Sequence, residues 1–316
     1  MLKKLGYYKG INLGGWLSQC DYSRQRTETF ITEPDIAKIA SWGADHVRVP
    51  LDYNVLQNED GSFSEYGFSK IDEIYDICRR YDLNVVLDLH KTPGFSFDFG
   101  EKESGFFVNE KYQEIFYSIW AELASRYGKY HDHIMFELLN EVTEKAFMES
   151  WKRISTECIK RIREKAPDTF ILIGGYHNNA VSAVCDIGKP YDDKVIYNFH
   201  CYEPLKFTHQ GAYWTPDINP SERYSFDESN INEEYFEELF KSALDSAKEN
   251  NTVLYCGEYG VIDVVSPEET LRWYKVINAV FEKYNIGRSL WSYKEMNFGF
   301  SDKRMDGIRE ELLKYI

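Results

Sequence analysis

The sequence lacks a long apolar segment and an excess of positive charge. None of its hydrophobic runs approaches the ~18 residues that a membrane-spanning helix needs, and the amino-terminal MLKKLGYYKG lacks the apolar core of a signal peptide. The 52 acidic residues outnumber the 37 basic ones and give a formal charge of −15, which repels phosphate backbones and anionic lipids. We therefore expect no nucleic-acid or membrane partner, and either a cytoplasmic chain or an exported one whose leader lies outside this sequence.

Paired cysteine motifs are also absent. No two cysteines form a CxxC pair, and a chain of 316 residues can build a core without disulfides. We expect reduced thiols, several of them packed as small apolar side chains. The six positions are Cys20, Cys78, Cys158, Cys185, Cys201 and Cys256.

Aromatic side chains, by contrast, are abundant. The 7 Trp, 24 Tyr and 20 Phe residues exceed what one core needs, so some of them should line a surface that accepts flat rings. A hydrophobic content of 43% together with 28% charged residues is typical of a globular protein and argues against disorder.

Short strand-like runs alternate with segments of helical period along the whole chain. In 68–81, for example, Ile71, Ile74, Tyr75 and Cys78 fall on one helical face. Eight strands at about forty residues per unit predict an α/β fold of the (β/α)8 TIM-barrel type. The predicted strands are 7–13, 45–51, 83–90, 133–140, 170–175, 194–202, 252–260 and 287–293.

A doubly wound nucleotide-binding sheet would alternate in the same way. Its glycine fingerprint is missing, because INLGGWLSQ after the first strand lacks the GxGxxG spacing and carries Trp16 where a phosphate would need room. We therefore expect one barrel domain over 1–316, active as a monomer, with an enlarged loop at about 203–235 after the sixth strand. A long loop on the catalytic face of a barrel is usually functional.

Polar residues gather at the carboxyl ends of the predicted strands, which is the face where barrel enzymes place their catalytic groups. His131 and His133, which could suggest a metal pair, precede the fourth strand on the opposite face, so we expect no metal. The residues at the carboxyl ends are Arg48, His90, Asn140, Glu141, His200, Tyr202, Glu258 and Trp291.

Glu141 and Glu258 follow the fourth and seventh strands, which lie across the pocket from each other in a closed barrel. Two carboxyl groups about 5–5.5 Å apart suit retaining glycoside hydrolysis, in which one protonates the leaving oxygen and the other attacks the sugar. Arg48 could keep the attacking group ionised. Strand-end glutamates alone are a weak signal, because acidic barrel loops also serve solubility.

The full set of motifs is more specific. The segments GINLGGW, DHVRVP, LDLHKTPG, FELLNE, YNFHCY, GEYG and SLWSY resemble glycoside hydrolase family 5, the cellulase family A, over essentially the whole chain. Within that family the chain is most similar to the clostridial endoglucanase C group. The resemblance implies a retaining (β/α)8 hydrolase with its active site at the carboxyl-terminal face of the barrel.

The resemblance also implies roles for individual residues. Glu141 would be the acid/base and Glu258 the nucleophile, Arg48 and Tyr202 would contact the nucleophile, and Trp291 would form the floor beneath the sugar. The sugar and the two glutamates would be surrounded by His90, Asn140 and His200. One departure is Lys91, which stands where close relatives often have a second histidine; it bears on substrate fit.

The expected activity is endo-acting hydrolysis of β-1,4 links in cellulose-like or mixed-linkage β-1,3-1,4-glucans, without a cofactor. The alternatives are a β-mannanase or an exo-acting β-glucosidase with the same mechanism and, more remotely, a catalytically silent sugar-binding barrel. The partner would be a neutral β-glucan polysaccharide or oligosaccharide. Further sugar subsites are expected at Trp16, Phe95, Phe207, Tyr213 and Trp214, each of which could equally be a core ring.

Overall fold

Eight parallel strands close into a single barrel. The computed structural model describes residues 1–98, 100–216 and 218–315. Each strand pairs with its neighbours in chain order, and β8 pairs back with β1 through Ile11 and Leu290. The strands are β1 (Lys9–Asn12), β2 (His46–Asp52), β3 (Asn84–Lys91), β4 (Ile134–Glu137), β5 (Ile171–Ile173), β6 (Val195–Cys201), β7 (Leu254–Tyr259) and β8 (Gly287–Leu290).

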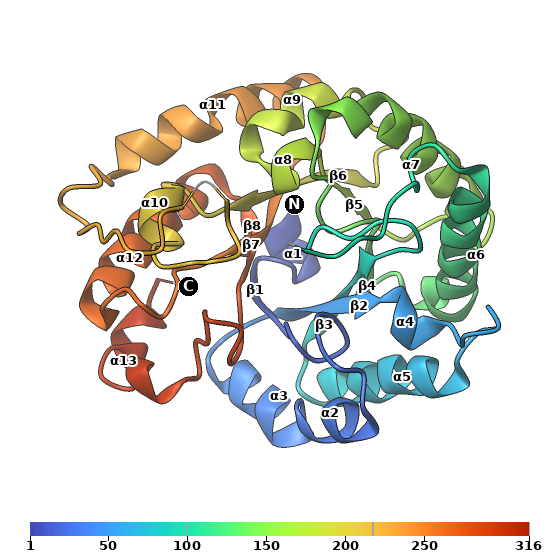
Figure 1. Cartoon of the computed structure of the whole chain (residues 1–316), viewed down its shortest axis with the longest axis horizontal. Helices are drawn as coiled ribbons and strands as arrows, with labels where there is room; N and C mark the ends of the chain where they lie inside the picture. The colour runs from blue at the N-terminus through green and yellow to red at the C-terminus, as the bar shows by residue number, and fades with distance from the viewer. Residues whose placement is uncertain (99, 217, 316) are drawn as a thin grey trace.

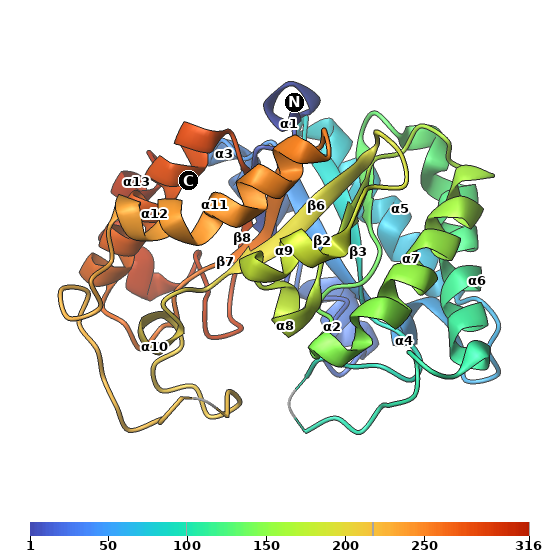
Figure 2. The same ribbon diagram turned by 90° about the horizontal axis from the view of Figure 1, so that it is seen from above.

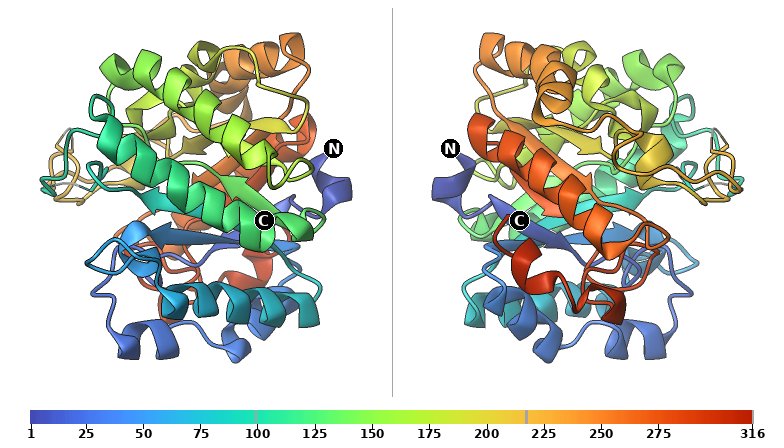
Figure 3. Two further views of the ribbon diagram at one scale, coloured as in Figure 1. Left: turned by 90° about the vertical axis from the view of Figure 1, so that its right-hand side faces the viewer. Right: turned by 90° about the vertical axis from the view of Figure 1, so that its left-hand side faces the viewer.

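Helices surround the barrel, as Figure 1 shows. The longer ones are α3 (Glu33–Ser41), α5 (Glu65–Arg80), α6 (Glu110–Tyr127), α7 (Met148–Arg163), α11 (Glu233–Glu249) and α12 (Pro267–Tyr284). Shorter ones are α1 (Leu2–Leu5), α2 (Arg24–Thr29), α4 (Tyr53–Leu56), α8 (Tyr176–Asn179), α9 (Val184–Ile187), α10 (Leu205–Thr208) and α13 (Arg309–Leu312). In Figure 3, α6 and α7 cover one side of the barrel, and α12 and α13 lie on the opposite side.

The predicted (β/α)8 barrel is confirmed, with one local difference. Between β5 and β6 the chain forms only short helical turns, including α8 and α9, instead of one long helix. Elsewhere the sequence pattern holds: Ser64 caps α5 by accepting a hydrogen bond from the Gly67 N–H. The same helix buries Ile71 and Ile74 against the sheet. Among the described residues, no helix has both the length and the apolar character needed to cross a membrane.

Side chains inside the barrel change character from one end to the other. At the amino-terminal end an apolar cluster that includes Val86, Met135 and Ile196 is closed by Leu2 of α1. Since alternate residues of a strand face the same side, the inward positions two residues further on are Asp88, Glu137 and Asn198, all fully buried. Figure 2 shows α1 at one end of the barrel and the segments that follow β3 and β6 at the other.

All six cysteines are free thiols, and four of them are buried. Burial raises the pKa of the Cys78 thiol to about 12, so this group stays protonated and packs as a small apolar side chain.

Candidate active site

Asp88, Glu137 and Asn198 form a buried polar layer inside the barrel. The guanidinium of Arg48, a fully buried residue of β2, lies within this layer. Its Nε and Nη2 atoms donate to the two carboxylate oxygens of Glu137 at 2.7 and 2.8 Å, and its Nη1 atom donates to Glu258 at 2.8 Å. Asp88 lies 3.0 Å from Nη2. Burial opposes the charge of Arg48, but these three acids raise its pKa well above the usual value. Arg48 is therefore a permanent cation in the barrel interior.

Glu258 on β7 is held by donors on both carboxylate oxygens. Oε1 accepts the bond from Arg48, and Oε2 accepts one from the Tyr202 hydroxyl at 2.8 Å. Burial and the nearby Glu258 carboxylate raise the pKa of Tyr202 well above its usual value, so this hydroxyl keeps its proton. Gly257 makes the close packing possible, because a Cβ atom there would come within 2.8 Å of Asn198 and 2.9 Å of His200. Two donors therefore hold the Glu258 carboxylate in one orientation.

Glu141 lies four residues beyond the end of β4, in a different environment. Its Oε1 atom is 2.6 Å from Nδ1 of His200, and its Oε2 atom accepts a 2.7 Å bond from the Asn178 amide. Burial raises the pKa of Glu141 to about 7 and lowers that of His200 to about 4. His200 is thus a neutral ring beside a carboxyl group that holds a proton close to neutrality, as a general acid must.

The two glutamates face each other across a short gap. A carboxylate oxygen of Glu141, one of Glu258 and a ring nitrogen of His200 all lie within 4.8 Å of one another. This separation suits the retaining mechanism, which leaves no room for a water molecule between the acid and the nucleophile. The same three groups could in principle surround a metal ion. However, each of the four carboxyl oxygens already has a hydrogen-bond partner, and the adjacent Arg48 charge disfavours a second cation.

Asn140, His90 and Trp291, three further predicted site residues, are all buried at the strand ends. Asn140 accepts a 2.6 Å bond from Arg48 through Oδ1, and its buried Nδ2 atom has no hydrogen-bond partner among the described residues. It can therefore donate to a substrate hydroxyl. The rings of Trp291 and His90 are stacked, with centroids 5.8 Å apart. Gly14 lies under the indole, where a Cβ atom would come within 2.7 Å of the ring.

Three of the five predicted additional sugar subsites are core rings, so these predictions are wrong. Trp16 is only 3% exposed and its Nε1 atom donates to the Thr27 carbonyl at 2.9 Å, so its ring packs in the core beneath α2. Phe207 on α10 is fully buried, edge-on to Phe226. Phe95, which is 5% exposed, also packs among core rings, against Phe107.

The aromatic pair on the long loop after β6 has a different environment. Tyr213 is 80% exposed, and the half-buried Trp214 meets it edge-on, with ring centroids 5.0 Å apart. A sugar subsite at Trp214 therefore stays a prediction.

Several site residues escaped the sequence analysis. Asp88 and Glu137 stand two and four residues before His90 and Glu141, in LDLH and FELLNE, where inward alternation could have identified Asp88. Asn178 lies in GGYHNN, five residues beyond the end of β5, and no strand-end pattern marks it. Lys91, the departure from relatives, pairs with Asp98 at 2.8 Å and Glu101 at 2.6 Å, and so fastens the segment after β3.

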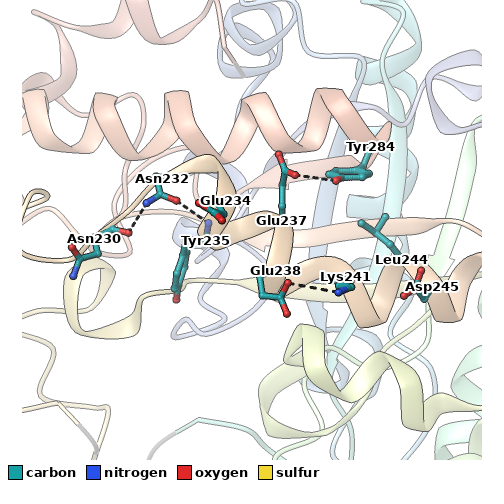
Figure 4. Close-up of a pocket in the computed structure, with 10 residues that line it drawn as sticks. All are labelled: Asn230, Asn232, Glu234, Tyr235, Glu237, Glu238, Lys241, Leu244, Asp245 and Tyr284. Atoms are coloured by element: carbon teal, nitrogen blue, oxygen red, sulfur yellow. Dashed lines mark hydrogen bonds and ion pairs between the residues drawn. The ribbon is translucent and has the colours of Figure 1, made fainter.

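A shallow hollow on the outer face of α11 contrasts with this site (Figure 4). Its side chains are mainly carboxylates and amides that pair locally, as Glu238 does with Lys241 and Glu237 with Tyr284. The hollow contains none of the strand-end residues. It has the character of the solvated helix face that the acidic run NEEYFEEL predicts.

Eight parallel strands in a closed barrel, with two facing glutamates after β4 and on β7, define the class, a (β/α)8 glycoside hydrolase. The profile of the family Cellulase (glycosyl hydrolase family 5) matches residues 9–297, and the chain belongs to this family. The resemblance seen in the sequence is thereby confirmed.

Individual relatives agree with the family. The chain is 61% identical over 288 residues to cellodextrinase A of Ruminococcus flavefaciens, covering 91% of this chain and 86% of the relative. It is 35% identical to endoglucanase C of Acetivibrio thermocellus, covering 99% and 98%. Among solved structures, subunit Z of clostridial cellulose synthase from Clostridioides difficile superposes with a TM-score of 0.83 at 26% identity, covering 98% and 99%.

The Asn178–Glu141 hydrogen bond predicts a shift in the pH profile. Asn178 has a φ of 56°, which glycine adopts without strain, so Asn178→Gly removes the donor and leaves the backbone in place. Because that donor favours the ionised carboxyl, its loss should raise the Glu141 pKa from about 7. We expect the ionisation of Glu141 in the alkaline limb of kcat/KM to move up by on the order of one pH unit.

His177→Gly is the matched control for this experiment. His177 also has a positive φ, of 50°, and its ring packs on Tyr176 rather than on the acid. The alkaline limb of kcat/KM for His177→Gly should lie at the same pH as that of the native enzyme. Equal shifts in the two variants, or a limb that moves to lower pH in Asn178→Gly, would contradict the role given to Asn178.

Proposed function

We propose that this chain is a retaining β-1,4-glucanase that cleaves cello-oligosaccharides and related β-glucans through a covalent glycosyl-enzyme on Glu258. The observation that carries the proposal is the pair Glu141 and Glu258, within 4.8 Å of each other and with different hydrogen-bond partners. Glu141 is the buried group with a pKa of about 7. Glu258 is the carboxylate that Arg48 and Tyr202 hold for attack.

The reaction takes place in two displacements. In the first, Glu258 forms a bond to the anomeric carbon, the glycosidic C–O bond breaks, and Glu141 gives its proton to the leaving oxygen. In the second, Glu141 takes a proton from water, the hydroxide oxygen bonds to the anomeric carbon, and the Glu258 ester bond breaks. Both steps occur on the same carbon with inversion, so the product keeps the β configuration.

The polar layer below the site supports the charge changes of this cycle. Glu258 loses its negative charge while it is esterified, and Arg48 then keeps Glu137 as its bidentate carboxylate partner. The cation therefore does not need to move between the two half-reactions. A positive charge held in this position stabilises the carboxylate as the leaving group of the second step.

The relatives bear on the substrate. The 61% identity to cellodextrinase A supports short cello-oligosaccharides as the substrate of this chain. The 35% identity to endoglucanase C supports internal cleavage of longer glucans as the second candidate. β-Mannanase or exo-β-glucosidase action would use the same two glutamates. The intact acid and nucleophile argue against a silent sugar-binding barrel.

A comparison of substrates tests the proposal. Cellotetraose, cellohexaose, barley glucan, carboxymethyl cellulose and mannohexaose are incubated with the enzyme, and products are followed by chromatography and by proton NMR of the new anomeric centre. We expect cellohexaose to be cleaved faster than the polymers, with the β anomer released first. Faster cleavage of mannohexaose, release of glucose alone from chain ends, or an α anomer as first product would each contradict part of the proposal.

A further inference from the structure

Five polar side chains form a line of polar contacts from the rim of the site to the barrel interior. Lys91 binds Asp98 at 2.8 Å, and the Gln19 amide Nε2 donates to the other oxygen of Asp98 at 2.6 Å. The Gln19 carbonyl oxygen is 3.3 Å from Nε2 of His90. On the other side of the ring, Nδ1 of His90 is 2.5 Å from Asp88.

The orientation of Gln19 fixes the first proton. Asp98 is paired with Lys91, so the group that faces it at 2.6 Å must be the Gln19 NH₂ and not its carbonyl oxygen. The Gln19 carbonyl therefore points at His90 and can only accept. Nε2 of His90 must then carry a hydrogen, since two acceptors would otherwise face each other.

The state of Nδ1 then decides the charge of the ring. If Nδ1 also carried a proton, His90 would be a cation, in a ring that is 1% exposed and clamped between Trp291 and Phe97. Burial lowers the pKa of His90 to about 3; the carboxylates of Glu258 and Asp98 oppose this shift, and the Arg48 cation and His200 add to it. His90 is therefore neutral, and Nδ1 presents a lone pair to Asp88.

A lone pair 2.5 Å from a carboxyl oxygen requires a proton on the carboxyl group. Of the surrounding charges, Glu141 favours the protonated acid, whereas the Arg48 cation, 3.0 Å from the same oxygen of Asp88 and shared with Glu137 and Glu258, favours the ionised one. Burial raises the pKa of Asp88 to about 7, although Arg48 opposes this shift. The second oxygen of Asp88, Oδ1, is buried without a hydrogen-bond partner among the described residues.

We propose that Asp88 is a positioning residue that holds a proton for Nδ1 of His90 and thereby makes His90 present an N–H, not a lone pair, to the sugar above Trp291. Asp88 also lies 3.0 Å from Arg48, but it acts on the sugar through the ring of His90. The consequence for the sugar rests on the proposed function, whereas the position of the proton does not. When Asp88 ionises, the remaining ring proton moves to Nδ1, and the donor toward the site is lost.

Two substitutions of Asp88 separate this role from that of a carboxylate. In Asp88→Asn the amide N–H can donate to Nδ1 as the protonated acid does, so kcat/KM on cellohexaose should stay within about tenfold of the native value. Asp88→Ala removes the donor and should cost about 100-fold or more. If Asp88 instead acts as a carboxylate, Asp88→Asn imposes the wrong tautomer on His90. The kcat/KM of Asp88→Asn should then fall at least as far as that of Asp88→Ala, and this result would overturn the proposal.

The pH profile gives a readout that a purely structural role would not change. The alkaline limb of the native enzyme should report two ionisations, those of Asp88 and Glu141, and that of Asp88→Asn only one. Identical limbs in the two proteins would contradict the proposal.

Nitrogen NMR of the native enzyme, labelled at histidine, tests the proton directly and needs no folded variant. At about pH 6 the proposal requires the His90 proton on Nε2, with a shift toward Nδ1 as the pH rises. A His90 ring with its proton on Nδ1 at that pH overturns the proposal even if every glucan is hydrolysed. Conversely, a protonated Nε2 in an enzyme that cleaves no glucan would sustain the proton assignment and reject the proposed function.

Discussion

Replacing Glu258 with Gln should lower kcat/KM on cellohexaose by at least about 10⁴-fold, because an amide cannot form the glycosyl ester. That factor corresponds to about 5.5 kcal/mol of transition-state stabilisation. Glutamine has nearly the same shape as glutamate, its oxygen can accept from Arg48, and its NH₂ can donate to the Tyr202 oxygen. The fold should therefore persist. Steady-state kinetics should show the loss of kcat/KM, and a thermal unfolding scan should show an unchanged unfolding temperature.

Glu141→Ala is the matched variant, because it removes the other carboxyl group of the same pair. Natural substrates should be cleaved poorly, whereas an aryl cellobioside with an activated phenol needs no proton and should still undergo the first step. Azide, which needs no general base, should then release a β-glycosyl azide. Formation of an α-azide by Glu141→Ala would contradict the assignment of the two roles. The assignment would also fail if Glu258→Gln kept more than a few per cent of the native activity.

The strand-end residues could be predicted from the sequence because parallel strands place all their carboxyl ends on one face. Once eight strands were recognised, Arg48, Glu141 and Glu258 had to approach one another, although they are up to 210 positions apart. The alternation of inward-facing side chains extends the same logic one layer down, to Asp88 and Glu137. These inferences need only strand register, which the hydrophobic pattern sets.

The loop residues could not be predicted in the same way. Asn178 contacts Glu141 because residues 177–179 all have positive φ. The hydrophobic pattern of the sequence does not predict this backbone conformation. The aromatic residues Trp16 and Phe207 are evident in the sequence, but whether their rings face the site or the core is not. That orientation depends on how α2 and α10 pack. A count of aromatic residues predicts neither which rings are exposed nor which face a sugar.

Arg48→Met should destabilise the fold by about 3–5 kcal/mol, the usual cost of removing one partner from a buried ion pair. The substitution keeps an unbranched side chain of similar length, but it leaves Asp88, Glu137 and Glu258 in the barrel interior without their cation. These carboxyls would have to take up protons or draw water into the core. Urea unfolding measured at neutral pH should show the loss as a lower midpoint.

Arg288→Met is the matched control, because Arg288 is also fully buried in a strand, on β8. Its one carboxylate partner, among the described residues, is Glu282 at 2.8 Å, whose side chain is 43% exposed and so stays hydrated when the arginine is removed. We expect a smaller loss there, without a marked dependence on pH. A loss at Arg288 equal to that at Arg48 would show that arginine packing, and not the three buried acids, sets the cost.

The pH dependence of Arg48→Met follows from the sign of the carboxyl shifts. In the native protein burial already raises the pKa values of Asp88, to about 7, and of Glu137, and loss of the Arg48 charge can only raise them further. A carboxyl with a raised folded-state pKa binds more protons folded than unfolded, so its penalty is absent at low pH and grows as the pH rises from about 4 toward the folded-state value. The stability gap between Arg48→Met and the native enzyme should therefore be small near pH 5 and widest near pH 8, and a gap that is equal at both would show that the three acids are not what Arg48 holds in the core.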